Sequence, residues 1–206
     1  MNTLSSYKQF YKENYLYTPL FCEENIWQLI HSLSSSDIAI SKLWCLFITN
    51  PSQKVALLNQ QTAPLNQLVI WDYHVILLAD INHQSVIFDF DTRLDFVTSL
   101  DEYLKNTFIF FSKEIHEELI PYIRKIPAQS YLKHFYSDRS HMRNQIAASE
   151  YPPWPVINKG KTHCTPLRDY LNLKSDLNDN SSLIKVDSFP AVKQKLSCSF
   201  KAEKTD

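Results

Sequence analysis

One cysteine, one histidine and two aspartates stand where their side chains could act together as a thiol catalyst. Cys22 directly precedes an amphipathic helical pattern, His74 lies inside an apolar run, and Asp89 and Asp91 end the next apolar run. A helix N-terminus and a neighbouring imidazolium both stabilise a thiolate, which is the nucleophilic form of cysteine. A carboxylate beside the imidazole would fix its tautomer. These residues predict a thiol nucleophile assisted by a histidine–carboxylate pair.

A strand hairpin must position the histidine and the aspartates. The apolar runs that carry His74, Asp89 and Asp91 read as two strands joined by a short polar turn. A two-residue turn has two alternative registers, one with His74 opposite Asp89 and one with His74 opposite Asp91. Cross-strand neighbours share a face, and period-two alternation adds Asp72 to that face. The hairpin predicts an imidazole–carboxylate pair but does not choose between the two acids.

The remaining elements frame this hairpin. Residues 23–33 predict a helix with acidic residues in its first turn, where the helix dipole favours them. Strands are expected at 42–49, 54–58, 69–79 and 85–92, further helices at 99–108, at 112–123, from 129 onward and at 187–196, and a surface loop at 173–182. This order predicts an α+β fold, with a central, mostly antiparallel sheet flanked by helices, as a single catalytic domain over residues 1–206.

The order of cysteine, helix, strands, histidine and aspartate is similar to that of papain-like and transglutaminase-like thiol enzymes. Their shared chemistry is acyl transfer at an amide or ester carbonyl, and we expect a papain/transglutaminase-like core. Taken singly, each residue has a simpler interpretation: a lone cysteine is usually a small buried hydrophobe, as we expect of Cys45 in LWCLFIT. A lone histidine on a strand, such as His74, is more often a structural group than a catalyst. The three residue types in this order favour the catalytic interpretation.

Composition narrows the classes of partner. The formal net charge of the 206 residues is −1 and no segment carries a basic stripe, so nucleic acid is not an expected partner. The N-terminus lacks an apolar signal core and no apolar run reaches membrane-spanning length, so no membrane partner is expected. Cys22, Cys45, Cys164 and Cys198 show no CxxC spacing, which disfavours a disulfide framework or a zinc site. We expect a reducing, cytoplasmic location, and a nuclear one in addition.

Residue usage excludes two further kinds of site. The single glycine, Gly160, rules out both a P-loop and a GxGxxG phosphate cradle. Turns that need a positive φ are therefore expected at Asn, Asp and Ser. His163 and Cys164 are too few for a metal site and are expected in a loop.

Four stretches are more specific than any spacing argument: FCEENIW at 21–27, VIWDYHVILL at 69–78, FDFDT at 88–92 and SYLKHFYSDRSHM at 130–142. In this order they closely resemble the protein N-terminal glutamine amidohydrolases, a family sometimes named for its Trp-Asp-Tyr-His-Val motif. The departures from the family pattern lie in loops, with little glycine near the hairpin turn and no proline in TRLDFV at 92–97.

The resemblance implies a monomeric thiol hydrolase that acts on proteins or peptides with an N-terminal glutamine. It would convert the side-chain amide to glutamate through a thioester and release ammonia, which in eukaryotes is a step of the N-degron pathway. Matching the motifs residue by residue implies Cys22 as nucleophile, His74 as base and Asp89 as the acid that orients the base. No metal and no organic cofactor is implied.

Recognition of a chain terminus requires a pocket for an α-ammonium group. Glu23, Glu24 and Asp72 are the acids closest in sequence to the predicted catalytic residues, and we expect one of them to bind the amine. First-turn glutamates also stabilise a helix whatever its function. A carboxylate near Cys22 would moreover raise the pKa of the thiol and oppose its activation.

In SDRSHM, at 137–142, we expect Asp138 and Arg139 to form local polar pairs that hold a loop beside the pocket. We do not expect His141 to be a second catalytic histidine.

Two other functions remain compatible with the residues. A transglutaminase-like or peptidase activity on internal glutamine or peptide bonds would need the same three catalytic groups. A non-catalytic adaptor that binds N-termini is the alternative from another class. The presence of all three of Cys22, His74 and Asp89 argues against the adaptor.

Overall fold

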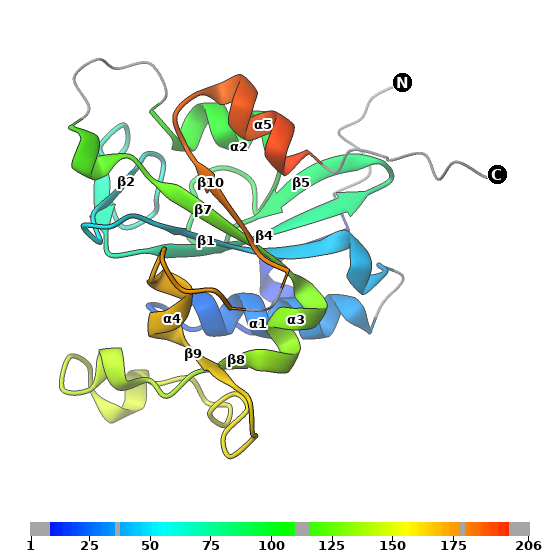
Figure 1. Cartoon of the computed structure of the whole chain (residues 1–206), viewed down its shortest axis with the longest axis vertical. Helices are drawn as coiled ribbons and strands as arrows, with labels where there is room; N and C mark the ends of the chain where they lie inside the picture. The colour runs from blue at the N-terminus through cyan, green and yellow to red at the C-terminus, as the bar shows by residue number, and fades with distance from the viewer. Residues whose placement is uncertain (1–8, 36–37, 110–115, 178–179, 198–206) are drawn as a thin grey trace.

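The computed structural model describes residues 9–35, 38–109, 116–177 and 180–197, and its centre is a six-stranded sheet (Figure 1). In spatial order the strands are β10 (Ser182–Lys185), β7 (Tyr122–Pro127), β1 (Leu43–Thr49), β4 (His74–Ile81), β5 (Gln84–Phe88) and β6 (Val97–Ser99). Every neighbouring pair is antiparallel. The predicted α+β fold with a mostly antiparallel sheet is confirmed.

Each face of the sheet carries its own hydrophobic core. Along β1, Cys45 and Phe47 pack into one core while Leu46 and Ile48 pack into the other, as the two-residue period of a strand requires. The first core is covered by α1 (Cys22–Ser34), α3 (Ala128–His134) and α4 (Leu167–Leu171), and the second by α2 (Leu100–Thr107) and α5 (Phe189–Leu196). Figure 1 shows these two groups of helices on opposite sides of the sheet.

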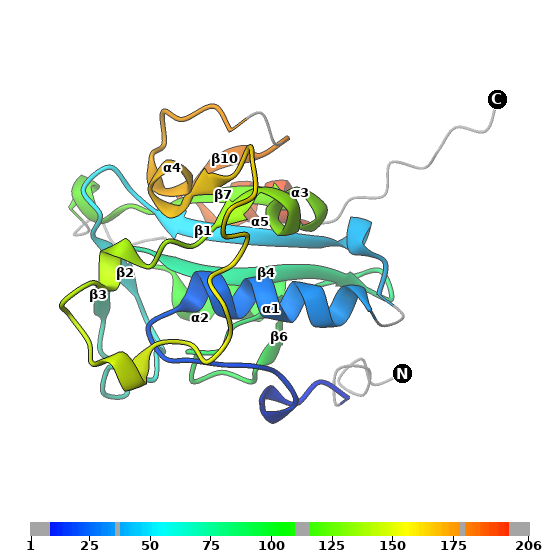
Figure 2. The same ribbon diagram turned by 90° about the horizontal axis from the view of Figure 1, so that it is seen from below.

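Helix α1 follows the predicted pattern. Ile26, Leu29, Ile30 and Leu33 recur at helical spacing and are buried against the first core. The helix runs along β4 (Figure 2), so its first residue, Cys22, lies near the end of the sheet where β4 begins.

The described residues also form two small sheets and several short 3₁₀ helices. β2 (Val55–Leu57) pairs antiparallel with β3 (Val69–Trp71), and β8 (Phe135–Tyr136) pairs parallel with β9 (Thr165–Pro166). The 3₁₀ helices are η2 (Lys12–Asn14), η3 (Ile40–Lys42), η4 (Glu117–Leu119), η5 (Ser140–Met142) and η6 (Ala148–Glu150). Among the helices described, none has the length and apolarity needed to span a membrane.

The strand predicted at 69–79 is in fact two strands. β3 ends at Trp71 and β4 begins at His74, and the two belong to different sheets. Asp72 lies in the link between them, so the alternation that placed it on the strand face of His74 is interrupted, and that prediction was wrong. Both halves of the run are apolar, since β4 is buried throughout and Val69 and Trp71 of β3 pack against the second core, so the sequence does not reveal the break.

The helix predicted at 112–123 is also incorrect. Residues 112–115 lie outside the described residues, Glu117–Leu119 forms η4, and Tyr122–Pro127 is β7, between β10 and β1 in the sheet. Pro121 cannot sit inside a helix without losing a hydrogen bond. Strand β10, which pairs with β7 at the edge of the sheet, was not predicted.

The turn between β4 and β5 consists of Asn82 and His83, with positive φ of 51° and 63°. Two successive positive φ values match a type I′ turn, whose twist suits a two-residue hairpin. Asn occupies six of the eleven described non-glycine positions with positive φ, and neither Asp nor Ser occupies one. The expectation for turn residues is therefore confirmed for Asn alone.

Candidate active site

A cavity of about 680 Å³ opens where the start of α1 meets the start of β4. Cys22 and His74 both line it. The other lining residues lie within 17–20, 70–73 and 138–146, at Asp91, within 166–171, and at Gln53 and Thr62. Segments that are far apart in sequence thus surround the predicted cysteine and histidine.

Cys22 is the first residue of α1. Its sulfur accepts the backbone N–H of Val75 and lies 3.7 Å from Oε2 of Glu23. The helix N-terminus and this N–H favour a thiolate. Burial and the carboxylates of Glu23 and Asp91 nevertheless raise the pKa of Cys22 well above its ordinary value. The resting side chain is therefore a thiol that needs a base to become a nucleophile.

His74 and Asp89 form a buried pair, with 2.9 Å between Nε2 and Oδ1. Burial lowers the pKa of His74, but the charge and hydrogen bond of Asp89 outweigh it and leave that pKa raised. Burial raises the pKa of Asp89, whereas His74 and the other hydrogen-bond donors lower it, and the net pKa lies below the ordinary value. Because the pair uses Nε2, Nδ1 is the ring nitrogen that can exchange a proton with a group in the cavity.

Neighbouring residues orient this pair from two directions. The Tyr103 hydroxyl, from α2, donates to Oδ2 of Asp89 at 2.8 Å, and the Asp91 backbone N–H donates to Oδ1 at 2.9 Å. The ring of Trp71 packs against the imidazole of His74, with 4.8 Å between centroids. The tautomer and the direction of the imidazole are therefore both constrained.

The strand register does not decide which aspartate meets the histidine. β4 and β5 pair Leu77 with Phe88, a register that, if continued, would set His74 opposite Asp91. Pairing stops at Phe88, and Asp89 lies beyond the strand, with its side chain against the imidazole. We predicted that the aspartate opposite His74 in the strand register would be the one that contacts it, and that prediction was wrong.

Asp91 also faces the cavity. Its Oδ1 accepts the hydroxyl of Tyr17 at 2.6 Å. The ring of Tyr17 stacks on Phe90, with 5.3 Å between centroids, and the ammonium of Lys12 lies 4.3 Å from the Tyr17 ring centre. Among the described residues, no ion pair engages Asp91.

His74, Asp89 and Asp91 each offer one ligand atom, and the three atoms lie within 4.8 Å of one another. Such a set could hold a metal ion. The ion would have to displace the direct His74–Asp89 hydrogen bond, however, since both atoms would then face the metal. The observed contact suits a proton-transfer pair better.

Glu23 is fully buried behind Cys22 and is not among the residues that line the cavity. Its Oε2 accepts the Tyr73 hydroxyl at 3.0 Å, and its Oε1 lies 3.5 Å from Nε2 of His141 without a hydrogen bond. Burial is the main cause that raises the pKa of Glu23 to about 7. The acid therefore titrates close to neutral pH beside the thiol.

Glu24 is fully buried as well, and its carboxylate is fully engaged. Nε and Nη2 of Arg139 donate to its two oxygens, each at 2.8 Å. Ser137 and the indole N–H of Trp154 donate to the same carboxylate. This contact ties the start of α1 to the segment that forms one wall of the cavity, and it leaves no carboxylate oxygen turned toward a ligand.

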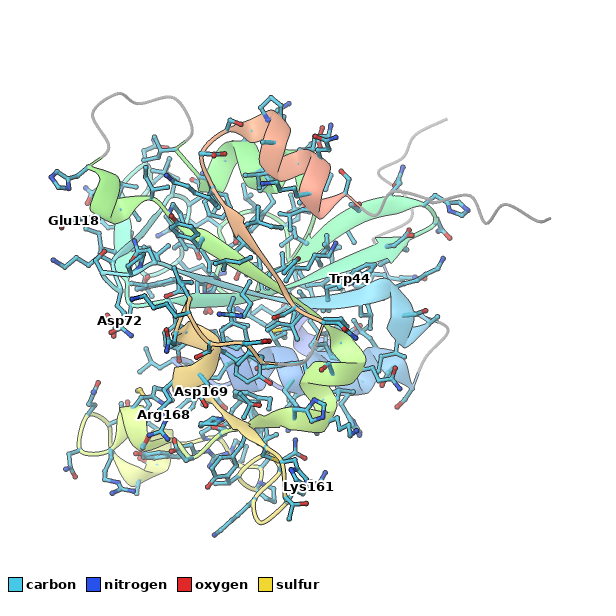
Figure 3. The ribbon with its side chains drawn as sticks, in the orientation of Figure 1. Trp44, Asp72, Glu118, Lys161, Arg168 and Asp169 are labelled. Atoms are coloured by element: carbon cyan, nitrogen blue, oxygen red, sulfur yellow. The ribbon has the colours of Figure 1, made fainter. Side chains whose placement is uncertain are left out.

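Asp72 is the one of the three predicted amine ligands that lines the cavity, and it is exposed at the mouth. Figure 3 shows it at the periphery of the molecule, on the same side as Arg168 of α4. Asp138 accepts both the N–H and the hydroxyl of Ser140, which confirms its predicted local role. Arg139 instead pairs over a long range with Glu24, so the predicted local pair was wrong for that residue.

Of the cysteines that the structure describes, Cys45 and Cys164 do not line the cavity. Cys45 is fully buried in β1, as expected. Cys164 is a half-buried free thiol in the loop that also contains His163. Cys198 lies outside the described residues.

The family model of N-terminal glutamine amidase matches residues 17–192. This span is most of the chain and contains every segment that lines the cavity. The chain belongs to the N-terminal glutamine amidase family. The resemblance expected from the four sequence motifs is thereby confirmed.

Relatives of this chain carry the name protein N-terminal glutamine amidohydrolase. The protein of Bos taurus is 35% identical over 166 residues, which is 79% of each chain. That of Homo sapiens is 35% identical over 162 residues, 77% of this chain and 78% of the relative. That of Danio rerio is 37% identical over 140 residues, 67% and 69% of the two chains.

Two site residues of this amidase family member carry no signal in the sequence. Tyr17 and Tyr103 reach Asp91 and Asp89 from positions 74 and 14 residues away. With eleven tyrosines in the chain, no spacing singles out these two. His141, from SDRSHM, lines the cavity as well.

Proposed function

We propose that this chain is a thiol amidohydrolase that converts the N-terminal glutamine of proteins or peptides to glutamate and releases ammonia. The observation that carries the proposal is one cavity, in a chain of this family, that is lined by a cysteine at a helix N-terminus and by a histidine paired with a buried aspartate. The names of the relatives support the same reaction.

The first half of the reaction forms a thioester. Nδ1 of His74 takes the proton of Cys22, and the thiolate attacks Cδ of the glutamine side chain. The Cys22 backbone N–H, one of the first N–H groups of α1, is a donor for the oxyanion that develops. The imidazolium returns its proton to the departing nitrogen, so that ammonia leaves as the C–N bond breaks and the acyl–sulfur bond remains.

The second half hydrolyses the thioester. His74 accepts a proton from water, the hydroxide adds to the acyl carbon, and the C–S bond breaks. The sulfur regains the proton from the imidazolium, and the carboxylic acid is released. The balance is one amide and one water giving one acid and one ammonia. Asp89 keeps the imidazole in one tautomer and stabilises its charged form in both halves.

We also propose that the core is papain- or transglutaminase-like. Cys22 begins the helix that covers one core of the sheet, whereas Asp89 is held by Tyr103 from α2, which covers the other core. The catalytic groups thus meet at the end of the sheet, in the order cysteine, histidine and aspartate along the chain. We expect a monomer in the cytoplasm.

Mass spectrometry of three matched peptides tests the proposal. One begins with glutamine, the second is its N-acetylated copy, and the third carries glutamine only internally. We expect the mass change of amide-to-acid conversion and ammonia release for the first peptide alone. Equal conversion of the acetylated or internal peptide would favour a transglutaminase-like activity, cleaved products would indicate a peptidase, and binding without conversion would indicate an adaptor.

A further inference from the structure

We propose that Asp91, held in place by Tyr17, is the residue that binds the α-ammonium group of the substrate glutamine. This inference rests on the proposed function and names the group that distinguishes a chain terminus from internal glutamine. Asp91 was considered from the sequence only as a possible partner of the histidine, and the structure gives that place to Asp89.

The size of glutamine limits where such a residue can lie. Four bonds of about 1.5 Å separate the α-nitrogen from Cδ, so the two atoms are at most about 5 Å apart. A charge-assisted hydrogen bond adds about 2.8 Å. The carboxylate that binds the ammonium must therefore lie close to the sulfur that attacks Cδ and to the imidazole that protonates the leaving group.

Asp91 meets this requirement. One of its oxygens lies within 4.8 Å of a ring nitrogen of His74, and its charge is close enough to Cys22 to raise the pKa of the thiol. It lines the cavity. Its side chain is half-buried, so an ion pair formed there is less screened by water than one on the surface.

The other acids are less suited to the role. Asp72 is exposed at the cavity mouth, and Asp138 uses one carboxylate oxygen to hold Ser140. Glu23 does not line the cavity. Glu24 is saturated by Arg139 and its neighbours.

The contacts of Asp91 leave one oxygen for a ligand. Tyr17 donates to Oδ1, while the backbone N–H of Asp91 donates to Asp89 and its carbonyl accepts the N–H of Gln61 at 2.7 Å. These bonds fix the backbone and one carboxylate oxygen. Since no ion pair to a described residue neutralises the side chain, an ammonium group would complete the charge balance of the site.

Binding of the ammonium would also help the nucleophile. The charge of Asp91 opposes ionisation of Cys22 in the free protein. A bound cation offsets that charge and so makes proton transfer from sulfur to His74 easier. A substrate with a blocked terminus would lose both its anchor and this activation.

The test crosses one variant with one substrate change. Asp91→Asn keeps the size and the backbone contacts of the residue, and a des-amino peptide carries hydrogen in place of the α-ammonium group. For the wild type we expect kcat/KM to favour the glutamine peptide over the des-amino peptide by roughly tenfold to a hundredfold, the range for a hydrogen bond between charged groups. For Asp91→Asn the two peptides should agree within about twofold, because the variant and the missing group remove the same interaction.

Two further variants and one reagent separate binding from damage to the site. Asp95→Asn is a matched control on the same segment, exposed and outside the cavity lining, and should keep the wild-type preference. Tyr17→Phe should partly reduce the preference for the glutamine peptide over the des-amino peptide. Alkylation of Cys22 by iodoacetamide at pH 7 should become faster in Asp91→Asn, since one charge that opposes the thiolate is gone.

Each contrary result has a distinct meaning. An Asp91→Asn protein that retains the preference for the glutamine peptide would overturn this inference. An equal loss of kcat/KM for both peptides, together with slower alkylation of Cys22, would overturn it too. That result would show that Asp91 acts through the His74–Asp89 pair. A wild type that releases ammonia from neither peptide would overturn the proposed function, and this inference with it.

Discussion

The carboxylate of Glu23 lies 3.7 Å from the sulfur of Cys22, its neighbour in sequence, and both side chains belong to the first turn of α1. A helix N-terminus favours negative charge, but two adjacent anions repel each other. The outcome is a protonated thiol beside an acid that titrates near neutral pH. The titration of Glu23 should appear in the pH dependence of the free energy of unfolding.

We expect the free energy of unfolding to fall as pH rises from about 4.5 to 7. The folded state holds the Glu23 proton up to about pH 7, whereas the unfolded chain releases it near 4.5. The folded state therefore binds more protons in this window, and the stabilisation present below it is lost as pH rises through the folded pKa. The full effect is about 3 kcal/mol, from 1.36 kcal/mol for each pKa unit.

Urea denaturation of Glu23→Gln and of the wild type at pH 5 and pH 8 measures this contribution. The amide does not titrate, so the variant should lose less stability than the wild type between the two pH values. Parallel losses in the two proteins would show that Glu23 is not the titrating group.

Cys22→Ala and Cys22→Ser should abolish ammonia release while the protein remains folded, because each removes the thiolate nucleophile. Cys45→Ala serves as the comparison, since Cys45 is fully buried in β1 and does not line the cavity. It should lose about 1 kcal/mol of stability through a small cavity and retain turnover. An inactive Cys45→Ala together with an active Cys22→Ala would contradict the assignment.

Asp89→Asn should fold and lose most of kcat, because an amide can stabilise the wrong tautomer of His74. The same change in a serine protease triad costs about 10⁴-fold, which sets the scale. Tyr103→Phe removes one donor to Asp89 and should lower stability by about 1 kcal/mol with a smaller loss of kcat. Steady-state kinetics and thermal denaturation of both variants test this order. A fully active Asp89→Asn would remove the aspartate from the mechanism.

Arg139→Met should be strongly destabilising, since it leaves the charge of Glu24 buried with fewer donors. Breaking a buried pair in this way costs about 3–5 kcal/mol, and the remaining donors Ser137 and Trp154 place the expected value at the lower end. The exposed pair Arg168–Asp169 offers a matched comparison, and Arg168→Met should change stability by less than about 1 kcal/mol. Equal effects in denaturant titrations would contradict this.

Glu24 was one of three acids expected from the sequence as candidate ligands for the substrate amine, and kinetic measurements on a Glu24 variant test that role. Glu24→Gln keeps most of the hydrogen-bond geometry. We expect its main effect on stability, with KM for a glutamine peptide close to that of the wild type. A large increase in KM in a stable protein would favour the sequence-based prediction.

Local patterns in the sequence were sufficient for the elements that carry Cys22 and His74. The apolar spacing of residues 23–33 predicts α1 because a single helix face is buried against one core. The β4–β5 hairpin follows from two apolar runs around a two-residue turn. Such signals lie within a few residues of the elements that they specify.

The positions of the other site residues depend on the path of the backbone beyond the ends of the helices and strands. Asp89 rather than Asp91 meets His74 because pairing stops at Phe88, and nothing in FDFDT marks that point. The break after Trp71 is hidden because both adjoining strands are apolar. Tyr17 and Tyr103 reach the aspartates through tertiary contacts, for which a single sequence carries no spacing rule.

The pair between Glu24 and Arg139 also limits how early the cavity can form during synthesis. The two residues are 115 positions apart, and at roughly 5–20 residues per second a ribosome needs about 6 to 23 s to add that length. Until then Cys22 has been translated, while the nearby buried acid Glu24 lacks its cation and one wall of the cavity is missing. The cavity is complete only after Leu171, the last described residue that lines it, has been added, so we expect a shorter nascent chain to lack the proposed activity.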